Sequence, residues 1–310
     1  MQTTRLMALA AFLCTYFSAP SQVLLWKKSP NGVTLLEDNE PLYHYQSSTK
    51  EQDGKYARSN YIHPFYGLHG EVLTEDFPDD HPHHRGIFWA WHQLYVEDRK
   101  AGDGWACEGL SWEVDKIKTK INYGYAELNA RVFWRGKVQG SAEEDQLIRE
   151  ETTITYQPIE NGKWYDFDIA LTALKHGTAI GGSEDDKGYS GFSARLFLPD
   201  DLIFRNKDGV VEPQRTPVEA GPWIDMLGTF DSIQQLKSGV TIMNHPSNPD
   251  AFKGWILRAQ KSMQNAAFPG ATTFPLPKGK TLHLRYRILV HPADWTAQDI
   301  ETLYSAYQRL

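Results

Sequence analysis

The 310-residue sequence predicts an all-β fold, a large antiparallel β-sandwich that ends in a short C-terminal helix. The first observation is that apolar and polar residues alternate over 117–135, 147–156, 164–174 and 281–290. Such a period of two is typical of antiparallel strands with one buried face. The second is a composition of 10 Trp, 15 Tyr and 14 Phe with 24 Gly and 17 Pro, which favours short strands joined by turns. The third is that apolar residues recur at helical spacing only after Asp294.

Residues 1–21 predict a cleaved export signal rather than part of the fold. Arg5 gives a positive start, and an apolar run of twelve residues follows over 6–17, which is too short to span a bilayer. Small residues allow cleavage after Ser21, and the alternative is a retained membrane anchor. We therefore expect a periplasmic or secreted protein in which residues 22–310 form a single β-sandwich domain.

The formal net charge of −7 excludes some classes of partner. Nonspecific nucleic-acid binding and binding to anionic membrane surfaces both need clustered lysine and arginine. No stretch after the signal approaches the length of apolar run that spans a membrane. We expect no nucleic-acid partner and no membrane association after signal cleavage. Cys107 would then be the lone thiol, buried and inert, and no intrachain disulfide is expected.

The remaining elements follow in chain order from turn residues and apolar runs. Residues 23–36 predict a hairpin that turns at Pro30-Asn31-Gly32. Residues 47–59 predict a polar loop, and 61–78 a structured loop that carries His63 towards the residues that follow. The helix after Asp294 would bury Ile300, Leu303, Tyr304 and Tyr307. Further strands are expected at 42–45, 87–96, 192–198, 223–230, 240–244 and 254–260.

The stretch from Asp76 to His92, DFPDDHPHHRGIFWAWH, is the densest in groups that transfer protons or bind metals. If its backbone is extended, His81 and His83 share a face and His84 points to the other. Three interpretations stay open. His81 and His83 could bind a divalent metal with a distant carboxylate, one histidine could act as general acid or base, or the imidazoles could be structural.

The residues that follow these histidines add further candidates. Arg85 offers an anion-binding group and is followed by a flexible glycine. We expect His92 to pair with a neighbour in its strand. In the Gly-rich run 177–191, Glu184 or Asp185 offers a partner carboxylate and Lys187 a cation. The alternatives for this run are a solvated turn or a calcium loop.

Two later segments carry polar groups at the ends of predicted strands. His245 and Asn248 could bind sugar hydroxyls or complete a metal site, and the alternative is a turn initiated by Asn and Pro. Arg258, Arg285 and Arg287 lie on predicted strands, where arginine binds carboxylate or sulfate well. Surface ion pairs are the alternative for at least one of these arginines.

Four segments together resemble one bacterial family, often exported, which carries the label methane oxygenase PmoA. They are the run from Tyr61 to His92, GGSEDDKGYSGFSARL, IMNHPSNP and LRYRILVHP. The resemblance implies a galactose-mutarotase-like supersandwich, a fold of epimerases, lyases and glycoside hydrolases. It also implies a histidine that acts as acid at a sugar ring oxygen, from His81, His83 or His84, and a carboxylate that acts as base, Glu184 or Asp185.

The sequence therefore predicts an exported carbohydrate-active enzyme that opens or epimerises a sugar, or eliminates across a glycosidic bond. The alternatives are a noncatalytic sugar-binding module and a metal-dependent enzyme. The catalytic candidates are His81, His83, His84 and Glu184. The residues expected to bind the carbohydrate are His63, Arg85, His92, Asp185, Lys187, His245, Asn248 and Arg258. For this chemistry, the imidazoles, the acid and Arg258 must meet in one open pocket.

Overall fold

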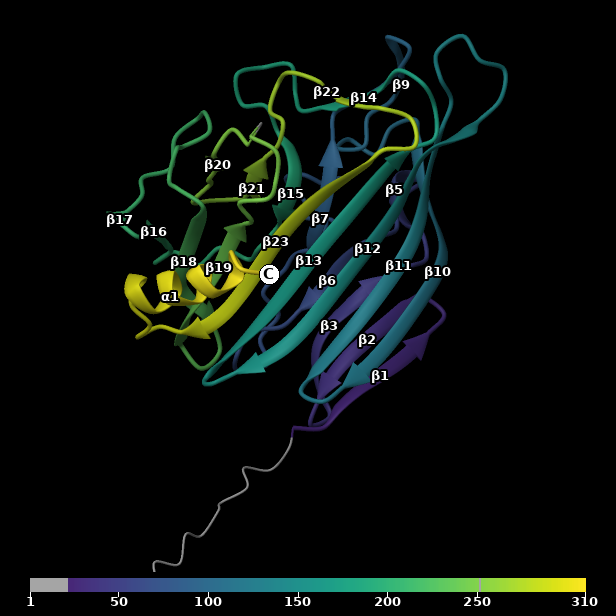
Figure 1. Ribbon diagram of the computed structural model, residues 1–310. Coiled ribbons are helices and arrows are strands. Elements are labelled where there is room, and N and C mark those ends of the chain that lie inside the picture. The colour runs from purple at the N-terminus through teal and green to yellow at the C-terminus, as the bar shows by residue number, and fades with distance from the viewer. Residues whose placement is uncertain (1–21, 251) are drawn as a thin grey trace, which may run out of the picture.

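The computed structural model describes residues 22–250 and 252–310, so the predicted signal segment 1–21 lies outside the described residues. The described chain folds mainly into two large antiparallel sheets that pack face to face, and its one α-helix lies near the C-terminus. In Figure 1 the long strands of one sheet lie in front of the other sheet, and the helix packs at one end of the front sheet. The all-β sandwich with a short C-terminal helix is confirmed.

One large sheet has eight strands within the described residues. Its order is β1 (Leu24–Ser29), β2 (Gly32–Glu37), β3 (Glu40–Gln46), β6 (Tyr61–Phe65), β7 (Ile87–Trp91), β15 (Ser190–Ala194), β21 (Gln264–Ala267) and β20 (Trp255–Ile256). The predicted hairpin at 23–36 is confirmed as β1 and β2, because Ser29 pairs with Gly32 across the turn.

The other large sheet has nine strands in the same part of the chain. Its order is β10 (Leu110–Asn122), β11 (Tyr125–Gly136), β12 (Asp145–Ile159), β13 (Gly162–Ala173), β23 (Thr281–Pro292), β19 (Leu236–Asn244), β18 (Trp223–Asp231), β16 (Ile203–Asn206) and β17 (Gly209–Val210). Two small sheets complete the described fold. Their strands are β22 (Phe274–Leu276), β14 (Thr178–Gly181), β8 (Gln93–Val96) and β9 (Arg99–Gly102), and β4 (Lys50–Gln52) with β5 (Lys55–Arg58).

The main core lies between the two large sheets and follows the predicted alternation. On β13 the residues Tyr165, Phe167, Ile169 and Leu171 are buried, at 0–1% exposure. The rings of Phe167 and Phe192 lie 5.0 Å apart between centroids, which joins β13 to β15 across the sandwich. Burial of such large side chains is the main favourable term in folding.

Three predicted segments differ from the structure. Residues 87–96 do not form one strand: β7 and β8 belong to different sheets, and His92 lies between them. The expected loop at 47–59 contains the β4–β5 hairpin, and only Trp255 and Ile256 of 254–260 form a strand. Cys107 is half-buried rather than buried, and it accepts a hydrogen bond from Arg58 at 3.7 Å.

The helix α1 (Ala297–Tyr307) begins with a capping box, in which Thr296 accepts from the backbone of Asp299 and Asp299 accepts from that of Thr296. This arrangement satisfies backbone donors that would otherwise lack partners. Its buried residues Ile300, Tyr304 and Tyr307 pack in a small core with Trp223, Met243 and Leu289. Among the described residues, no helix combines the length and apolar character needed to cross a bilayer.

Glu150 on β12 joins the two layers through a buried polar network. Its carboxylate is fully buried and accepts hydrogen bonds from Asn60 (2.9 Å), Trp134 (2.8 Å) and Thr152 (2.6 Å). Glu150→Gln would place an amide N–H₂ among these donors, so we expect the free energy of unfolding to fall by about 1–3 kcal/mol. Urea denaturation tests this. Glu151→Gln, on the exposed side of the same strand, is the matched control, and equal losses in both variants would contradict the prediction.

Candidate active site

The outer face of the eight-stranded sheet carries a second, smaller apolar cluster. Because side chains alternate along β7, Trp89 and Trp91 enter the main core while Phe88 and Ala90 face outward. Trp105, from the loop after β9, packs on this outer face and is 2% exposed. The cluster is formed by Tyr61, Phe88, Ala90, Trp105 and Met263, with the partly buried Tyr189 against it. The candidate site is built around this cluster.

The segment that carries His81, His83 and His84 forms a pair of turns and is not extended. The amide of His81 donates to the carbonyl of Pro78 (3.1 Å), and that of His84 to the carbonyl of His81 (2.9 Å). The rings of His81 and His84 are therefore stacked, 4.8 Å apart with planes 4° from parallel. The backbone is therefore not extended here, so the condition under which His81 and His83 would share a face is not met, and the turn instead brings together residues three apart.

Two histidines of the site are each bonded to an aspartate. His81 Nδ1 lies 2.7 Å from Asp80 Oδ2, and His92 Nδ1 lies 2.9 Å from Asp103 Oδ2. Burial raises the pKa of Asp80, but hydrogen bonds from Arg195 and His81 outweigh it and hold this pKa at about 2. The ionised carboxylates accept hydrogen bonds, so in each ring Nδ1 donates and Nε2 is left to exchange a proton.

His92 differs from the expectation, because its partner Asp103 lies in the loop after β9 and not in its own strand. Its ring is stacked on Trp105 with centroids 5.4 Å apart. Burial of the Asp103 carboxyl raises its pKa, and the hydrogen bond from His92 outweighs this effect, so the net pKa is lowered. Asp103 also accepts from the backbone of Ala106 at 2.8 Å, which holds the Trp105 loop in place.

His83 and His84 are uncharged near neutral pH. Burial, followed by the neighbouring His81, lowers the pKa of His83 to about 4. Burial, followed by His83, lowers the pKa of His84 to about 2. The ring of His83 lies edge-on to that of His84, with centroids 4.6 Å apart. We name His81, His83, His84 and His92 the histidine cluster.

Arg195 is a site residue that the sequence alone did not single out. It is 1% exposed, and it donates from Nε to Glu75 (2.7 Å) and from Nη2 to Asp80 (2.7 Å). Its Nη1 lies 3.4 Å from Nδ1 of His84, which therefore accepts. Arg195 thus positions both Asp80 and His84. It lies just after β15, within a run that shows only the alternation of a strand, so no local signal marks it.

Arg85, which the sequence predicts to bind the carbohydrate, is bonded within the protein. Its side chain has no exposed surface, and it donates to the backbone carbonyls of Pro82 (2.5 Å), His84 (3.0 Å) and Tyr56. Its guanidinium lies 3.4 Å from the ring centroid of Phe77. These contacts indicate that Arg85 stabilises the turns that carry His81, His83 and His84.

The loop between β14 and β15 brings Lys187 to the site through Tyr189. Lys187 Nζ lies 5.8 Å from the ring centroid of Tyr189, and this ring lies 5.5 Å from that of Trp105. Arg258 donates to the hydroxyl of Tyr189 at 2.8 Å. Lys187 and Arg258 are therefore connected through Tyr189 and Trp105 to the histidine cluster.

The two acids of this loop have different surroundings. Burial raises the pKa of Asp185, but hydrogen bonds from Ser183 and Lys187 outweigh it and hold this pKa at about 2. Asp185 also forms an ion pair with Lys187 at 3.2 Å, so it organises the loop. Glu184 is exposed, and no described contact joins it to a histidine. The carboxylates in contact with the histidines are Asp80 and Asp103 instead.

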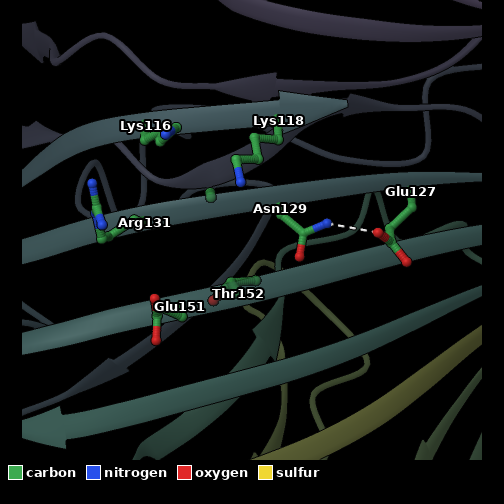
Figure 2. A pocket seen from close by; sticks show the side chains of 8 residues that line it. Lys116, Lys118, Glu127, Asn129, Arg131, Glu151 and Thr152 are labelled. Atoms are coloured by element: carbon green, nitrogen blue, oxygen red, sulfur yellow. Dashed lines mark hydrogen bonds between the residues drawn. The ribbon is translucent and has the colours of Figure 1, made fainter. Parts of the chain in front are cut away.

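A hollow of about 430 Å³ opens beside Tyr189. We call it the cationic hollow, and it is lined by Lys187, Tyr189, Pro213, Gln214, Arg215, Leu257, Arg258 and Ala259. A second hollow of about 470 Å³ lies over β10, β11 and β12 of the other large sheet. Figure 2 shows that Lys116, Lys118 and Arg131 share this β10–β12 hollow with Glu127 and Glu151.

Three predicted residues have their described hydrogen bonds and ring contacts outside the histidine cluster. His63 on β6 is bonded to Thr74 at 3.0 Å, and burial lowers its pKa. His245 follows β19 of the nine-stranded sheet and packs on Tyr307 of α1, with ring centroids 4.7 Å apart. Asn248 donates to the carbonyl of Arg285 (2.8 Å) and accepts from its amide (2.7 Å), so its amide group holds a turn. The proposed pocket does not include these residues.

A metal site does not form from the predicted ligands. The rings of His81 and His83 are 5.8 Å apart between centroids, and Nδ1 of His81 is bonded to Asp80, so Nε2 is the nitrogen of His81 that could bind a metal. Across residues 22–250 and 252–310, no three His, Cys, Asp or Glu side chains are grouped so that they could hold a metal ion. The donor geometry therefore does not fit the two-histidine, one-carboxylate site.

Twelve solved chains are similar to this one, and two of them are the following. A protein described as an aldose 1-epimerase from Escherichia coli K12 is 8% identical, with a TM-score of 0.35, and the match covers 87% of this chain and 99% of that one. The GH36 α-galactosidase AgaA from Geobacillus stearothermophilus is 10% identical, with a TM-score of 0.32, over 87% of this chain and 41% of that one. Likeness of this degree carries no argument about function. No curated protein matches the sequence.

The match to a family is extensive. Residues 32–305, which include every candidate site residue, match the family described as "Family of unknown function (DUF6807)". The chain therefore belongs to this family.

Proposed function

We propose that this protein is an exported carbohydrate-active enzyme whose histidine cluster performs acid–base chemistry on a sugar or glycoside. The observation that supports this most is the pair of Asp–His contacts, His81 with Asp80 and His92 with Asp103, on the same face as the uncharged His83. A structural role alone does not require two oriented imidazoles beside a neutral one.

The residues suggest separate roles in proton transfer. His83 is half-buried and neutral, so it accepts a proton from a carbon or hydroxyl of the substrate. His81 and His92 each have a carboxylate at Nδ1, which fixes the tautomer and stabilises the imidazolium that forms when Nε2 takes up a proton. Either ring, after it has taken up a proton from solvent, gives this proton to the oxygen that leaves or to the ring oxygen that opens, and His83 then releases to solvent the proton that it took from the substrate.

The carbohydrate ligand is proposed from the aromatic residues of the site. Tyr56 lies 6.4 Å from His83 between ring centroids, and Tyr189 lies 5.5 Å from Trp105. Both tyrosines are only half-buried, and flat rings with a polar end pack on the apolar faces of sugars while bonding to their hydroxyls. The mutarotase-like supersandwich and the PmoA-like resemblance stay part of this proposal, as do signal cleavage and a periplasmic or secreted location.

Replacement of His83 tests the proposed mechanism. On a panel of plant and algal glycans, we expect His83→Ala to lower turnover by about 100-fold or more, because a positioned general base contributes about that factor. His69→Ala is the matched control, since His69 is exposed and lies outside the cluster. Circular dichroism of both variants confirms that they are folded.

One outcome would contradict the role of His83, and another would contradict the enzyme proposal itself. Unchanged turnover in His83→Ala would remove this residue from the mechanism. Measurable glycan binding by the wild type, with no product from any glycan, would favour a noncatalytic sugar-binding module instead.

A further inference from the structure

The cationic hollow has an unusual balance of charge for a protein whose formal net charge is −7. Its lining includes the cations Lys187, Arg215 and Arg258, and it includes no carboxylate. In the β10–β12 hollow, by contrast, two glutamates accompany the lysines and the arginine. A concentrated positive potential in an acidic protein attracts anionic ligands to that place.

Within residues 22–250 and 252–310, no acidic side chain pairs with Arg258 in this hollow. Its guanidinium donates to the backbone carbonyls of Gln214 (2.7 Å), Leu257 (2.8 Å) and Arg215 (2.9 Å), and to the hydroxyl of Tyr189 (2.8 Å). All of these acceptors are neutral, so the positive charge is fixed in position and is not compensated. Its Nε also donates to the hydroxyl of Tyr189 (3.2 Å), so all five N–H groups of Arg258 are engaged within the protein. Arg258 therefore contributes a fixed positive charge, while Lys187 and Arg215 supply the N–H groups that can bond to the oxygens of a carboxylate or sulfate.

The other two cations are oriented from outside the lining. Lys187 pairs with Asp185 at 3.2 Å, and Arg215 pairs with Asp186. Neither aspartate lines the hollow. Each pair therefore orients a cation and offsets part of its charge, while the carboxylate itself is not part of the lining.

Tyr189 connects the hollow with the histidine cluster. It lines the hollow, and its ring lies 5.5 Å from that of Trp105, on which His92 is stacked. A sugar packed on Tyr189 with an anionic group at the cations would thus extend towards the histidines. We propose that the cationic hollow binds the carboxylate or sulfate of an acidic glycan, which names the substrate class of the proposed enzyme and rests on that proposal.

Isothermal titration calorimetry tests this binding without any need for turnover. The probes are oligogalacturonate, which supplies carboxylates, a sulfated carrageenan oligosaccharide, and a neutral galactan oligosaccharide. We expect the wild type to bind one or both acidic probes more tightly than the neutral one, with an affinity that falls as salt rises. The acidic probe that binds more tightly distinguishes carboxylate from sulfate as the anionic group.

Variants then locate the binding. Lys187→Gln and Arg215→Gln should each weaken binding of the acidic probe by about fivefold, and the double variant by more, because each removes one exposed charge contact. The neutral probe should be unaffected. The matched control is the Lys116→Gln, Lys118→Gln double variant, which removes the same charge from the β10–β12 hollow and should bind as the wild type does.

Three outcomes would overturn the inference: equal affinity for acidic and neutral probes, no binding of either acidic probe, or an equal loss in the control. These outcomes are separate from those that concern catalysis. Turnover of neutral glycans that depends on His83, with no affinity for acidic ones, would leave the enzyme proposal intact and remove only this inference.

Discussion

Lowering the pH from about 6.5 to about 4.5 is expected to reduce the free energy of unfolding by at least about 4 kcal/mol, with about 2 kcal/mol from each of His83 and His84. Burial also lowers the pKa values of His44, His63 and His245, which adds to the loss in the same direction. The folded-state pKa values of His83 and His84 are about 4 and about 2, below the ordinary value of 6.5. In this interval the unfolded chain takes up protons on both rings while the folded protein keeps them neutral. Stability therefore falls as pH falls. Urea denaturation at a series of pH values measures this change in the free energy of unfolding.

The carboxylates Asp80 and Asp185 contribute little to the change in the free energy of unfolding over this pH range. Asp80 and Asp185 have folded-state pKa values of about 2 against an ordinary 3.8, so their contributions are lost only at lower pH. His83→Gln removes one titrating ring and should reduce the change by about 2 kcal/mol over the same range. A variant as sensitive to pH as the wild type would show that His83 is not kept neutral by the fold.

Arg195→Met is expected to lower the free energy of unfolding by about 3 kcal/mol. The substitution keeps most of the buried aliphatic volume but removes the hydrogen bonds to Glu75 and Asp80, and breaking such a pair costs about 3–5 kcal/mol when the remaining charge is buried. The lower end applies because the two carboxylates keep 35% and 26% of their side-chain surface exposed. Thermal and urea denaturation check this value.

A surface pair provides the comparison for Arg195. Arg131 and Asp115 form an ion pair at 2.6 Å with side chains 42% and 37% exposed, so Arg131→Met should cost less than about 1 kcal/mol. Arg195→Met should also lose turnover, because Asp80 and through it His81 lose their support. Full stability in this variant would show that the buried guanidinium is not what orders the histidine turns.

The large sheets could be predicted because their signals are local. Alternation over 164–174 reflects a single buried face on β13, and the spacing of Ile300, Tyr304 and Tyr307 reflects one face of α1. The division of 87–96 between two sheets could not be predicted in this way. Gln93 bonds to the carbonyls of Gly182 (2.7 Å) and Ala271 (2.8 Å), and such distant partners leave no mark on the local pattern.

The candidate site was predictable in its composition but not in its geometry. The density of histidines identified the segment, yet its prolines are compatible with turns as well as with an extended chain. The partners of Arg195 lie 120 and 115 residues away in sequence, so its burial depends on the finished fold. Asp80, Asp103 and Trp105 act through contacts across loops, and only the structure separates them from the solvated acids and aromatic residues of other turns.

The two hydrogen bonds of Gln93 also have a consequence for ligand entry. They fasten the chain beside His92 to the start of the loop that carries Lys187 and Tyr189. The walls of the site are thus preorganised, and a ligand that bridges them loses little conformational entropy from the protein. Crystal structures of the free and of the ligand-bound protein should therefore superimpose closely around these loops. We expect the ligand to bind without closure of the loops.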